Sequence, residues 1–428
     1  MFSQGGLSLE QAPPISVVMR FFIMATSFGL LLGVFILIDK LEIASNFVQN
    51  SQLVIVHILA LGVMASFMLG ALFQMLPVIA GVVIKFPTKQ ATIVQLLFLV
   101  GLLLQLFLFA TKQNPPLLYF LASAYLGGGL LYASILMLKE LIQIKDHSSS
   151  SKGMIFALIG FILALSIGVY LLLTLGGFTT GSLFLEFKEI HYSFALFGWI
   201  SLLIVSVSFQ VIEMFYITPK YPNFMSKYLT LSIFTLLIMK SISLIIGIDS
   251  QAITLLIFTL FILYASITLH RLYKRKRPTS DATVWFWRLG MGLLIVSMSI
   301  TSIGLFITLN HQLELISYLT FIGFALSVIF AMVYKIVPFL TWFHLSNQGY
   351  MEAPMMHDVI HPKKAKIHFY IHVAMLSLWT VALTLDIIIL NILGSITIIA
   401  SFGWLLYNLI FAVKKYNYTQ KHTEKFEW

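Results

Sequence analysis

Twelve apolar stretches run through this sequence, and each is long enough to cross a lipid bilayer as a helix. A helix needs about 20 predominantly apolar residues to span the hydrocarbon core. Only 10% of the residues are charged and 59% are hydrophobic, whereas soluble domains have roughly 25% and 45–50%. The sequence therefore predicts an all-α, polytopic membrane protein in which residues 1–428 form one transmembrane domain. We expect the spans near residues 16–38, 52–82, 91–111, 116–138, 154–175, 189–217, 228–247, 250–270, 285–309, 313–342, 366–390 and 393–413.

The basic residues predict the orientation of the chain. If the amino terminus lies in the cytoplasm, most Lys and Arg residues fall in cytoplasmic loops, and the opposite loops contain only Lys40, Lys112 and Lys188. We therefore expect both termini on the cytoplasmic side of a bacterial-type inner membrane. The formal charge of +10 follows from the same bias, so it does not indicate nucleic-acid binding. The first 14 residues lack the basic region of a cleaved signal peptide, and we expect the first span to be retained.

The second, sixth and tenth spans share a spacing that indicates an internal repeat. In each, a glycine is followed after eleven intervening residues by a polar residue: Gly62 and Gln74, Gly198 and Gln210, Gly323 and Lys335. The copies recur every four spans, which predicts three pseudo-symmetric four-helix units near 16–138, 154–270 and 285–413.

This organisation resembles subunit I of the haem–copper oxidase superfamily. The segments HILALGVMASFMLGALFQMLPV (57–78) and EIHYSFALFGWISLLIVSVSFQVIEMFY (189–216) are similar to helices of its divergent, NnrS-type members, as is YKIVPFLTWFH (334–344). In subunit I these helices supply a haem ligand and a copper ligand. The resemblance therefore implies a haem, for which we expect haem b, or a copper ion, and it also implies redox partners in the membrane.

His57 and His191 are the first candidate ligands, because each precedes a repeat glycine near the outer end of its span. Imidazole nitrogen is a common axial ligand of haem iron. Gly62 and Gly198 are expected to let the flat haem ring lie against the helix backbone. The alternative is that both histidines are hydrogen-bonded interfacial residues without a ligand.

The sequence also departs from the oxidase pattern. The segment 227–247, which contains the seventh span, has no histidine. Tyr318 stands where a ligand of the tenth span is expected, and Ala195 lies four residues after His191. The absence of cysteine excludes thiolate metal sites, iron–sulfur clusters and covalently attached haem. We therefore do not expect a classical terminal oxidase, and the sequence leaves open whether the protein is an enzyme.

A second candidate metal site lies towards the predicted cytoplasmic ends of the spans. It consists of His344, at the end of the tenth span, and of His368 and His372, which are four residues apart on the eleventh. His357 and His361 have the same spacing in the preceding loop, and that loop could equally be a solvated connection.

Charged residues inside the spans are costly unless they are paired, so they are candidates for function. We expect Glu213 and Lys335 to form an ion pair, with Gln74 and Gln210 as hydrogen-bond partners. This cluster could be a proton or ligand relay, or a structural pair that fixes the packing of the helices. We also consider a pair between Lys240 and Asp386.

Two functions from different classes remain. The first is a haem- or copper-binding membrane protein with a redox, nitric-oxide or metal-handling role. The second is a secondary transporter or permease without a cofactor, in which the Glu213 and Lys335 region gates the path. An accessory membrane subunit without activity is a third possibility.

Overall fold

A computed structural model describes residues 12–41, 50–111, 115–276, 281–385 and 387–425. Within these residues, twelve helical spans are long and apolar enough to cross a membrane, which confirms the predicted polytopic helical fold. The helices are α1 Ile15–Lys40, α2 Ser51–His57, η1 Ile58–Ala65, α3 Ser66–Ala80, α4 Pro87–Ala110, α5 Pro116–Ile142, α6 Ser149–Leu175, α7 Phe184–Ser193, η2 Phe194–Ser201, α8 Leu202–Tyr216, α9 Asn223–Ile245, α10 Gln251–Tyr273, α11 Ala282–Gly304, α12 His311–Asn347, α13 Met356–Val359, α14 Pro362–Leu385 and α15 Ile388–His422.

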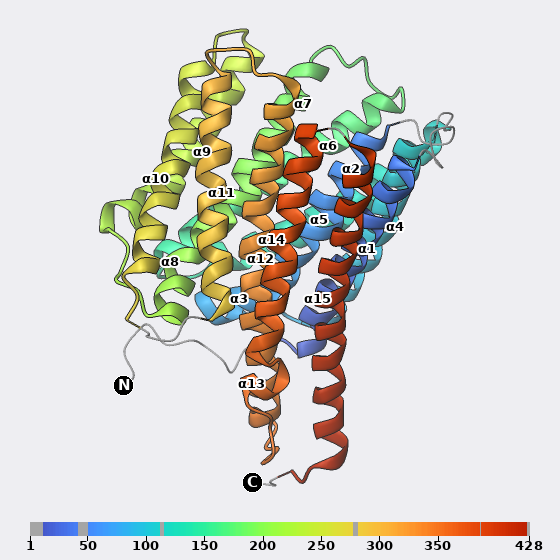
Figure 1. Cartoon of the computed structure of the whole chain (residues 1–428). Helices are drawn as coiled ribbons and strands as arrows, with labels where there is room; N and C mark the ends of the chain where they lie inside the picture. Colours follow the sequence, from blue (N-terminus) through green and yellow to red (C-terminus); the bar gives the residue numbers. More distant parts are fainter. Residues whose placement is uncertain (1–11, 42–49, 112–114, 277–280, 386, 426–428) are drawn as a thin grey trace.

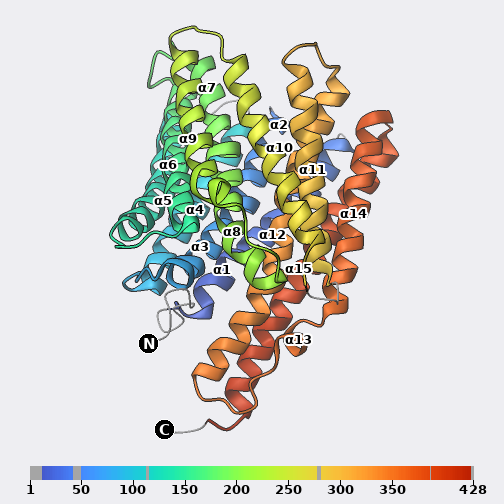
Figure 2. The ribbon, with the colours of Figure 1, turned by 90° about the vertical axis from the view of Figure 1, so that its left-hand side faces the viewer.

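The spans form one bundle, with α1 beginning and α15 ending at the same end of it (Figure 1). We call this the terminal end, and the other the opposite end. The helices α12 and α15 run further than the sequence predicted and project, with α13, beyond the rest of the bundle at the terminal end (Figure 2). Side-chain hydrogen bonds join the two extensions, because Gln348 donates to the Tyr416 hydroxyl (2.8 Å) and accepts from Gln420 (2.8 Å).

Three spans occupy the interior. The α2–η1–α3 span, the α7–η2–α8 span and α12 bury 67%, 78% and 78% of their most apolar segment, whereas the other spans bury 28–56%. These three are the second, sixth and tenth spans, which carry the repeated glycine spacing. The other nine surround them, with α15 packing against both α14 and α1. The inner spans therefore have little surface left for lipid.

The repeat in the second and sixth spans extends to the backbone. Each contains an eight-residue π-helical segment, η1 or η2, and the repeat glycine is the fifth residue of both. The tenth span is α-helical throughout. Short π segments inside α-helices frequently mark functional sites, and here each begins shortly after a candidate histidine.

Glycine permits the closest contacts between spans. A Cβ atom on Gly160 of α6 would lie 2.4 Å from the carbonyl oxygen of Gly198, and one on Gly101 of α4 would lie 2.3 Å from the backbone nitrogen of Leu126. Membrane helices associate largely through such packing, because lipid tails are as apolar as the side chains that face them.

Candidate metal centre between the second and sixth spans

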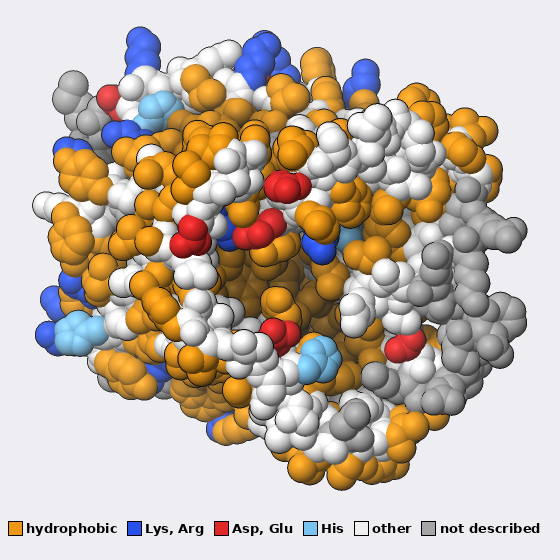
Figure 3. All heavy atoms as spheres, turned by 90° about the horizontal axis from the view of Figure 1, so that it is seen from above, with side chains coloured by type: hydrophobic (Ala, Val, Ile, Leu, Met, Phe, Trp, Pro, Cys, Tyr) orange, Lys and Arg blue, Asp and Glu red, His pale blue; other side chains and the backbone are white. Residues whose placement is uncertain are grey.

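His57 and His191 occupy similar positions along the second and sixth spans. His57 is the seventh residue of its span and His191 the eighth, which places both about 9–11 Å from the start of their helices. Each of the two rings is only half-buried. Seen from the opposite end, the bundle is hollowed, with hydrophobic side chains on the floor and acidic, basic and histidine side chains around the mouth (Figure 3).

The backbone fixes the tautomer of His57. Its Nδ1 lies 2.9 Å from the carbonyl oxygen of Leu53, and its ring packs against Phe109 with centroids 5.0 Å apart. A carbonyl oxygen can only accept a hydrogen bond, so Nδ1 must carry the proton. In the neutral ring, Nε2 then has an available lone pair.

His191 is held in the same way by a different helix. Its Nδ1 lies 2.8 Å from the carbonyl oxygen of Ala164 on α6, so Nδ1–H donates and Nε2 keeps its lone pair. The ring occupies the space left by Gly168, whose added Cβ would lie 2.8 Å from the His191 Cε1. Sequence analysis missed Ala164 and Gly168, because a sequence does not reveal which face of the fifth span meets the sixth.

The two imidazoles have the donor chemistry of metal ligands. Metal-binding histidines usually donate their second ring N–H to a carboxylate or backbone carbonyl, which fixes the ring orientation and the tautomer. Both rings meet this condition, and no described residue forms a hydrogen bond with either Nε2. The pair therefore fits a copper ion or a haem iron as far as the ligand atoms are concerned.

Gly62 and Gly198 both lie against aromatic side chains. A Cβ on Gly62 would lie 2.7 Å from Cγ of Phe28, and one on Gly198 would lie 2.7 Å from Cδ1 of Phe194. Both glycines therefore make room for these aromatic side chains, and their role beside a haem ring stays a prediction. The geometry around the two histidines fits a metal ion better than a macrocycle that lies against these glycines.

An ion pair between a buried lysine and a partly exposed glutamate lies beside His191. Lys240 of α9, whose side chain is 8% exposed, places Nζ 3.0 Å from Glu189 Oε1 and donates to Ser193 Oγ at 3.4 Å. The partner of Lys240 among the described residues is thus Glu189; the pairing with Asp386 that the sequence suggested involves a residue outside the described part of the chain. Measured from the repeat glycine, Ser193 occupies the place that His57 has in the second span. The sixth span therefore has a serine and lysine contact at this repeat position, and its histidine lies two residues earlier.

The predicted second metal site is only partly assembled. His368 and His372 on α14 are fully buried, and their Nε2 atoms form hydrogen bonds with the hydroxyls of Ser401 and Ser327, each at 2.9 Å. His344 does not join them. The ring of His368 packs against Tyr334, and His344 lies ten residues further along α12, which is about 15 Å of helix. His344 lines a separate cavity with Gln348 and Tyr416.

The described residues form no larger cluster of possible metal ligands in place of the predicted second site. In the part of the chain that the structure describes, no three His, Asp or Glu side chains come close enough to hold a metal together. His357 and His361 are exposed in and after α13. His357 lies 3.5 Å from Asp358, and His361 accepts a hydrogen bond from the backbone N–H of Lys363, in agreement with a solvated connection.

The predicted ion pair between Glu213 and Lys335 is wrong. Lys335 Nζ lies 2.6 Å from Asp281 Oδ2, because Asp281 caps the start of α11 beside the antiparallel α12. Glu213 accepts instead from the backbone N–H of Tyr221 at 2.8 Å. The position of Asp281 just before an apolar run is a recognisable helix-cap signal, but its proximity to Lys335 is tertiary information.

The two glutamines do not join this ion pair either. Gln210 and Glu213 line one polar cavity of about 500 Å³ near the loop from α8 to α9. Gln74 is 3% exposed, and neither of its amide atoms has a hydrogen-bond partner. It lines an apolar cavity of about 70 Å³ with Met214 and Ile336. The four residues therefore form no continuous relay.

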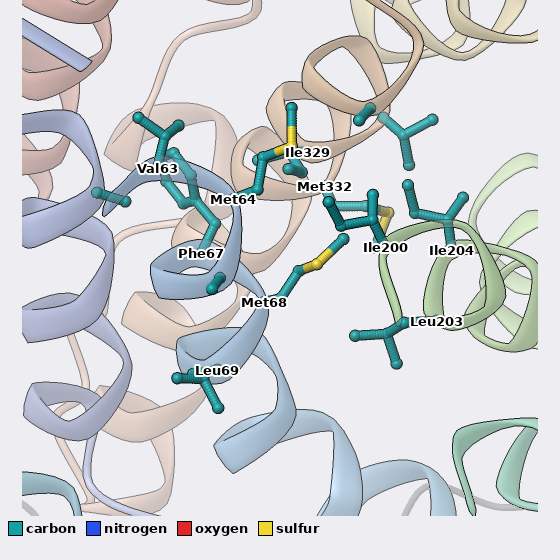
Figure 4. Close-up of a cluster of buried hydrophobic side chains, with 14 of the residues drawn as sticks. Val63, Met64, Phe67, Met68, Leu69, Ile200, Leu203, Ile204, Ile329 and Met332 are labelled. Atoms are coloured by element: carbon teal, nitrogen blue, oxygen red, sulfur yellow. The ribbon is translucent and has the colours of Figure 1, made fainter. Parts of the chain in front are cut away.

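Apolar side chains fill the centre of the three inner spans. Met64, Met68 and Met332 lie among Phe67, Ile204 and other hydrophobic residues there (Figure 4). A second apolar cavity of about 70 Å³ remains between α3, α8, α11 and α12. This layer separates the hollow at the opposite end from the polar cavity near Glu213.

Comparison with protein-family models gives no match, and no curated protein is significantly similar to the chain. The fold identifies an integral membrane protein, because the residues that the structure describes contain twelve apolar helical spans.

Proposed function

We propose that this protein binds a copper ion or a haem iron through His57 and His191, and that it is a divergent relative of haem–copper oxidase subunit I. One observation carries the proposal. Both Nδ1–H groups donate to backbone carbonyls, so two Nε2 lone pairs at the same depth are available to a metal. The arrangement of three inner and nine outer spans supports the relationship.

The chain's own residues define what this site does. The backbone carbonyls of Leu53 and Ala164 hold the two rings in one tautomer. Gly168 leaves the space that the His191 ring occupies. The ion pair between Lys240 and Glu189 places one positive and one negative charge near His191. A copper or haem iron bound there would supply one-electron redox chemistry. Because the ligands of a complete oxygen-reducing centre are missing from the sequence, the role we propose is redox, nitric-oxide or metal handling.

Optical spectroscopy and metal analysis of the full-length protein in detergent test the proposal. A haem gives a Soret band, and copper is measured directly after supplementation during expression. We expect His57→Ala and His191→Ala each to abolish the Soret band or to remove the one equivalent of copper held at this site, and His357→Ala, an exposed histidine, to leave the bound group unchanged. Protein that stays free of both groups despite supplementation would overturn the proposal.

Gly168 provides a test that removes no ligand atom. A Cβ at 2.8 Å from Cε1 is about 0.6 Å closer than the 3.4 Å of an ordinary contact. In Gly168→Ala the His191 ring must shift by that amount and stretch its hydrogen bond to Ala164. Losing an orienting contact of this kind typically lowers metal affinity by about 10–100-fold. Gly128→Ala is the matched control, because nothing lies within 4 Å of its added Cβ.

A cofactor-free transporter is the second candidate. The hollow at the opposite end (Figure 3) and the polar cavity that contains Glu213 lie at the two ends of the bundle, with the apolar centre between them. Alternating access to a central site requires this kind of separation. Ion-coupled uptake into proteoliposomes that is abolished by Glu213→Gln, in a preparation without metal, would favour the transporter.

A further inference from the structure

The eleventh span contains two histidines that the proposed function does not use. His368 and His372 lie one turn apart on the same face of α14, with neither exposed to solvent or lipid. Residues four apart on a helix are neighbours, with Cβ atoms about 5–6 Å apart. The two rings therefore lie together in the interior, in contact with α11, α12 and α15.

One nitrogen of each ring has a partner and the other has none. The Nε2 atoms form 2.9 Å hydrogen bonds with Ser401 of α15 and Ser327 of α12. Both Nδ1 atoms are buried without a hydrogen-bond partner. Buried polar atoms are rarely left unpaired, and an exception often marks a bound water or ion. Here two exceptions lie on adjacent residues of one helix face.

The hydrogen bonds allow both Nδ1 atoms to act as ligands. If each Nε2–H donates to its serine oxygen, both Nδ1 lone pairs are available in the neutral rings. Each serine is then the outer partner that orients a metal-bound imidazole. Because Ser327 and Ser401 come from different helices, they fix the two rings independently.

The surroundings select the charge of the ion. Phe286 and Phe330 each contact both histidine rings, at centroid distances from 4.6 to 5.7 Å, and Tyr334 packs against His368. No Asp or Glu among the described residues pairs with either histidine. A divalent cation would carry two uncompensated charges in this apolar place. A monovalent ion needs half of that compensation, and aromatic faces attract it.

We propose that His368 and His372 bind a single cuprous ion through their Nδ1 atoms, in a site separate from His57 and His191. Cuprous copper is monovalent and bound by soft or imidazole donors, whereas sodium and potassium prefer oxygen ligands. The site needs no third ligand from the chain. The inference does not rest on the proposed function, because it uses different residues from different helices.

Cuprous titration of the full-length protein tests the site. The protein is purified in detergent and titrated without oxygen, under reducing conditions, against a chromophoric cuprous chelator. His57→Ala/His191→Ala serves as the background, so that only the second site is counted. We expect one bound equivalent in this background, and none when His368→Ala/His372→Ala is added. His357→Ala/His361→Ala is the matched control, because it removes an exposed pair with the same spacing.

A second variant keeps both histidines, so that a loss of binding can be distinguished from a failure to fold. Ser327→Ala/Ser401→Ala removes the two orienting hydroxyls, and we expect the cuprous affinity to fall by about 10–100-fold. A background protein that binds no cuprous ion, or an equivalent that survives the loss of His368 and His372, overturns the inference. Either result leaves the His57 and His191 proposal intact, because that proposal is judged by the difference between wild type and background.

Discussion

The ion pair between Asp281 and Lys335 allows a prediction that does not depend on any ligand. The two oxygens of Asp281 have separate partners: Oδ1 accepts from the backbone N–H groups of Thr283 and Val284, and Oδ2 pairs with Lys335. Asparagine is as good a helix cap as aspartate. Asp281→Asn therefore keeps the cap and removes only the charge that faces Lys335.

The magnitude follows from the geometry. Two unit charges 2.6 Å apart attract by about 6 kcal/mol at an effective dielectric constant of about 20, and by about 1.6 kcal/mol in bulk water. The side chains of Lys335 and Asp281 are 20% and 32% exposed, so solvent screens the pair substantially. We expect a coupling free energy of about 2 kcal/mol, between these limits.

A double-mutant cycle measures this coupling. Asp281→Asn, Lys335→Met and the double variant are unfolded in mixed micelles of increasing SDS content, and far-UV circular dichroism follows the helix content. A second cycle with Glu213→Gln is the control, and we expect its coupling with Lys335 to be close to zero. A coupling below about 0.5 kcal/mol for Asp281, or a larger one for Glu213, would refute the reasoning.

Three further predictions use the same unfolding assay. Gly160→Ala places a Cβ 2.4 Å from the Gly198 carbonyl oxygen, so we expect a loss of about 1–3 kcal/mol; Gly292→Ala, with nothing within 4 Å, should be neutral. Gln74→Leu removes two buried, unpaired amide atoms and should stabilise the protein by about 1–3 kcal/mol; a loss of stability would contradict this. Burial raises the pKa of Asp281, but the Lys335 charge and hydrogen bond hold it below its ordinary 3.8. The contribution of Asp281 to the free energy of unfolding is therefore full above about pH 4 and is lost as the pH falls through the lower pKa of the folded state. Asp281→Asn should remove this part of the acid sensitivity.

The sequence was sufficient to predict the twelve helical spans that the described residues contain. Hydrophobic length determines where a helix enters and leaves the bilayer, so the apolar pattern alone places His57 and His191 at one depth. The repeated glycine spacing also marked the three spans that prove to be the most buried.

The neighbours of each residue could not be predicted in the same way. Lys335 and Glu213 occupy comparable depths, yet Lys335 pairs with Asp281, because the partner depends on which helices are adjacent and on how each is rotated. The same limit explains why His344 was grouped with His368. The sequence also does not show that aromatic side chains lie beside Gly62 and Gly198.

The π segments connect the ligand positions to the rest of their spans in an unusual way. A single inserted residue turns part of an α-helix into such a segment, and each residue of an α-helix advances the side chain by about 100°. Deleting one residue from η1 or η2 would therefore restore a regular helix and swing His57 or His191 by about that angle, while the inner half of the span kept its packing. In this architecture the direction in which an imidazole points can be changed by the gain or loss of one codon, independently of the bundle below it.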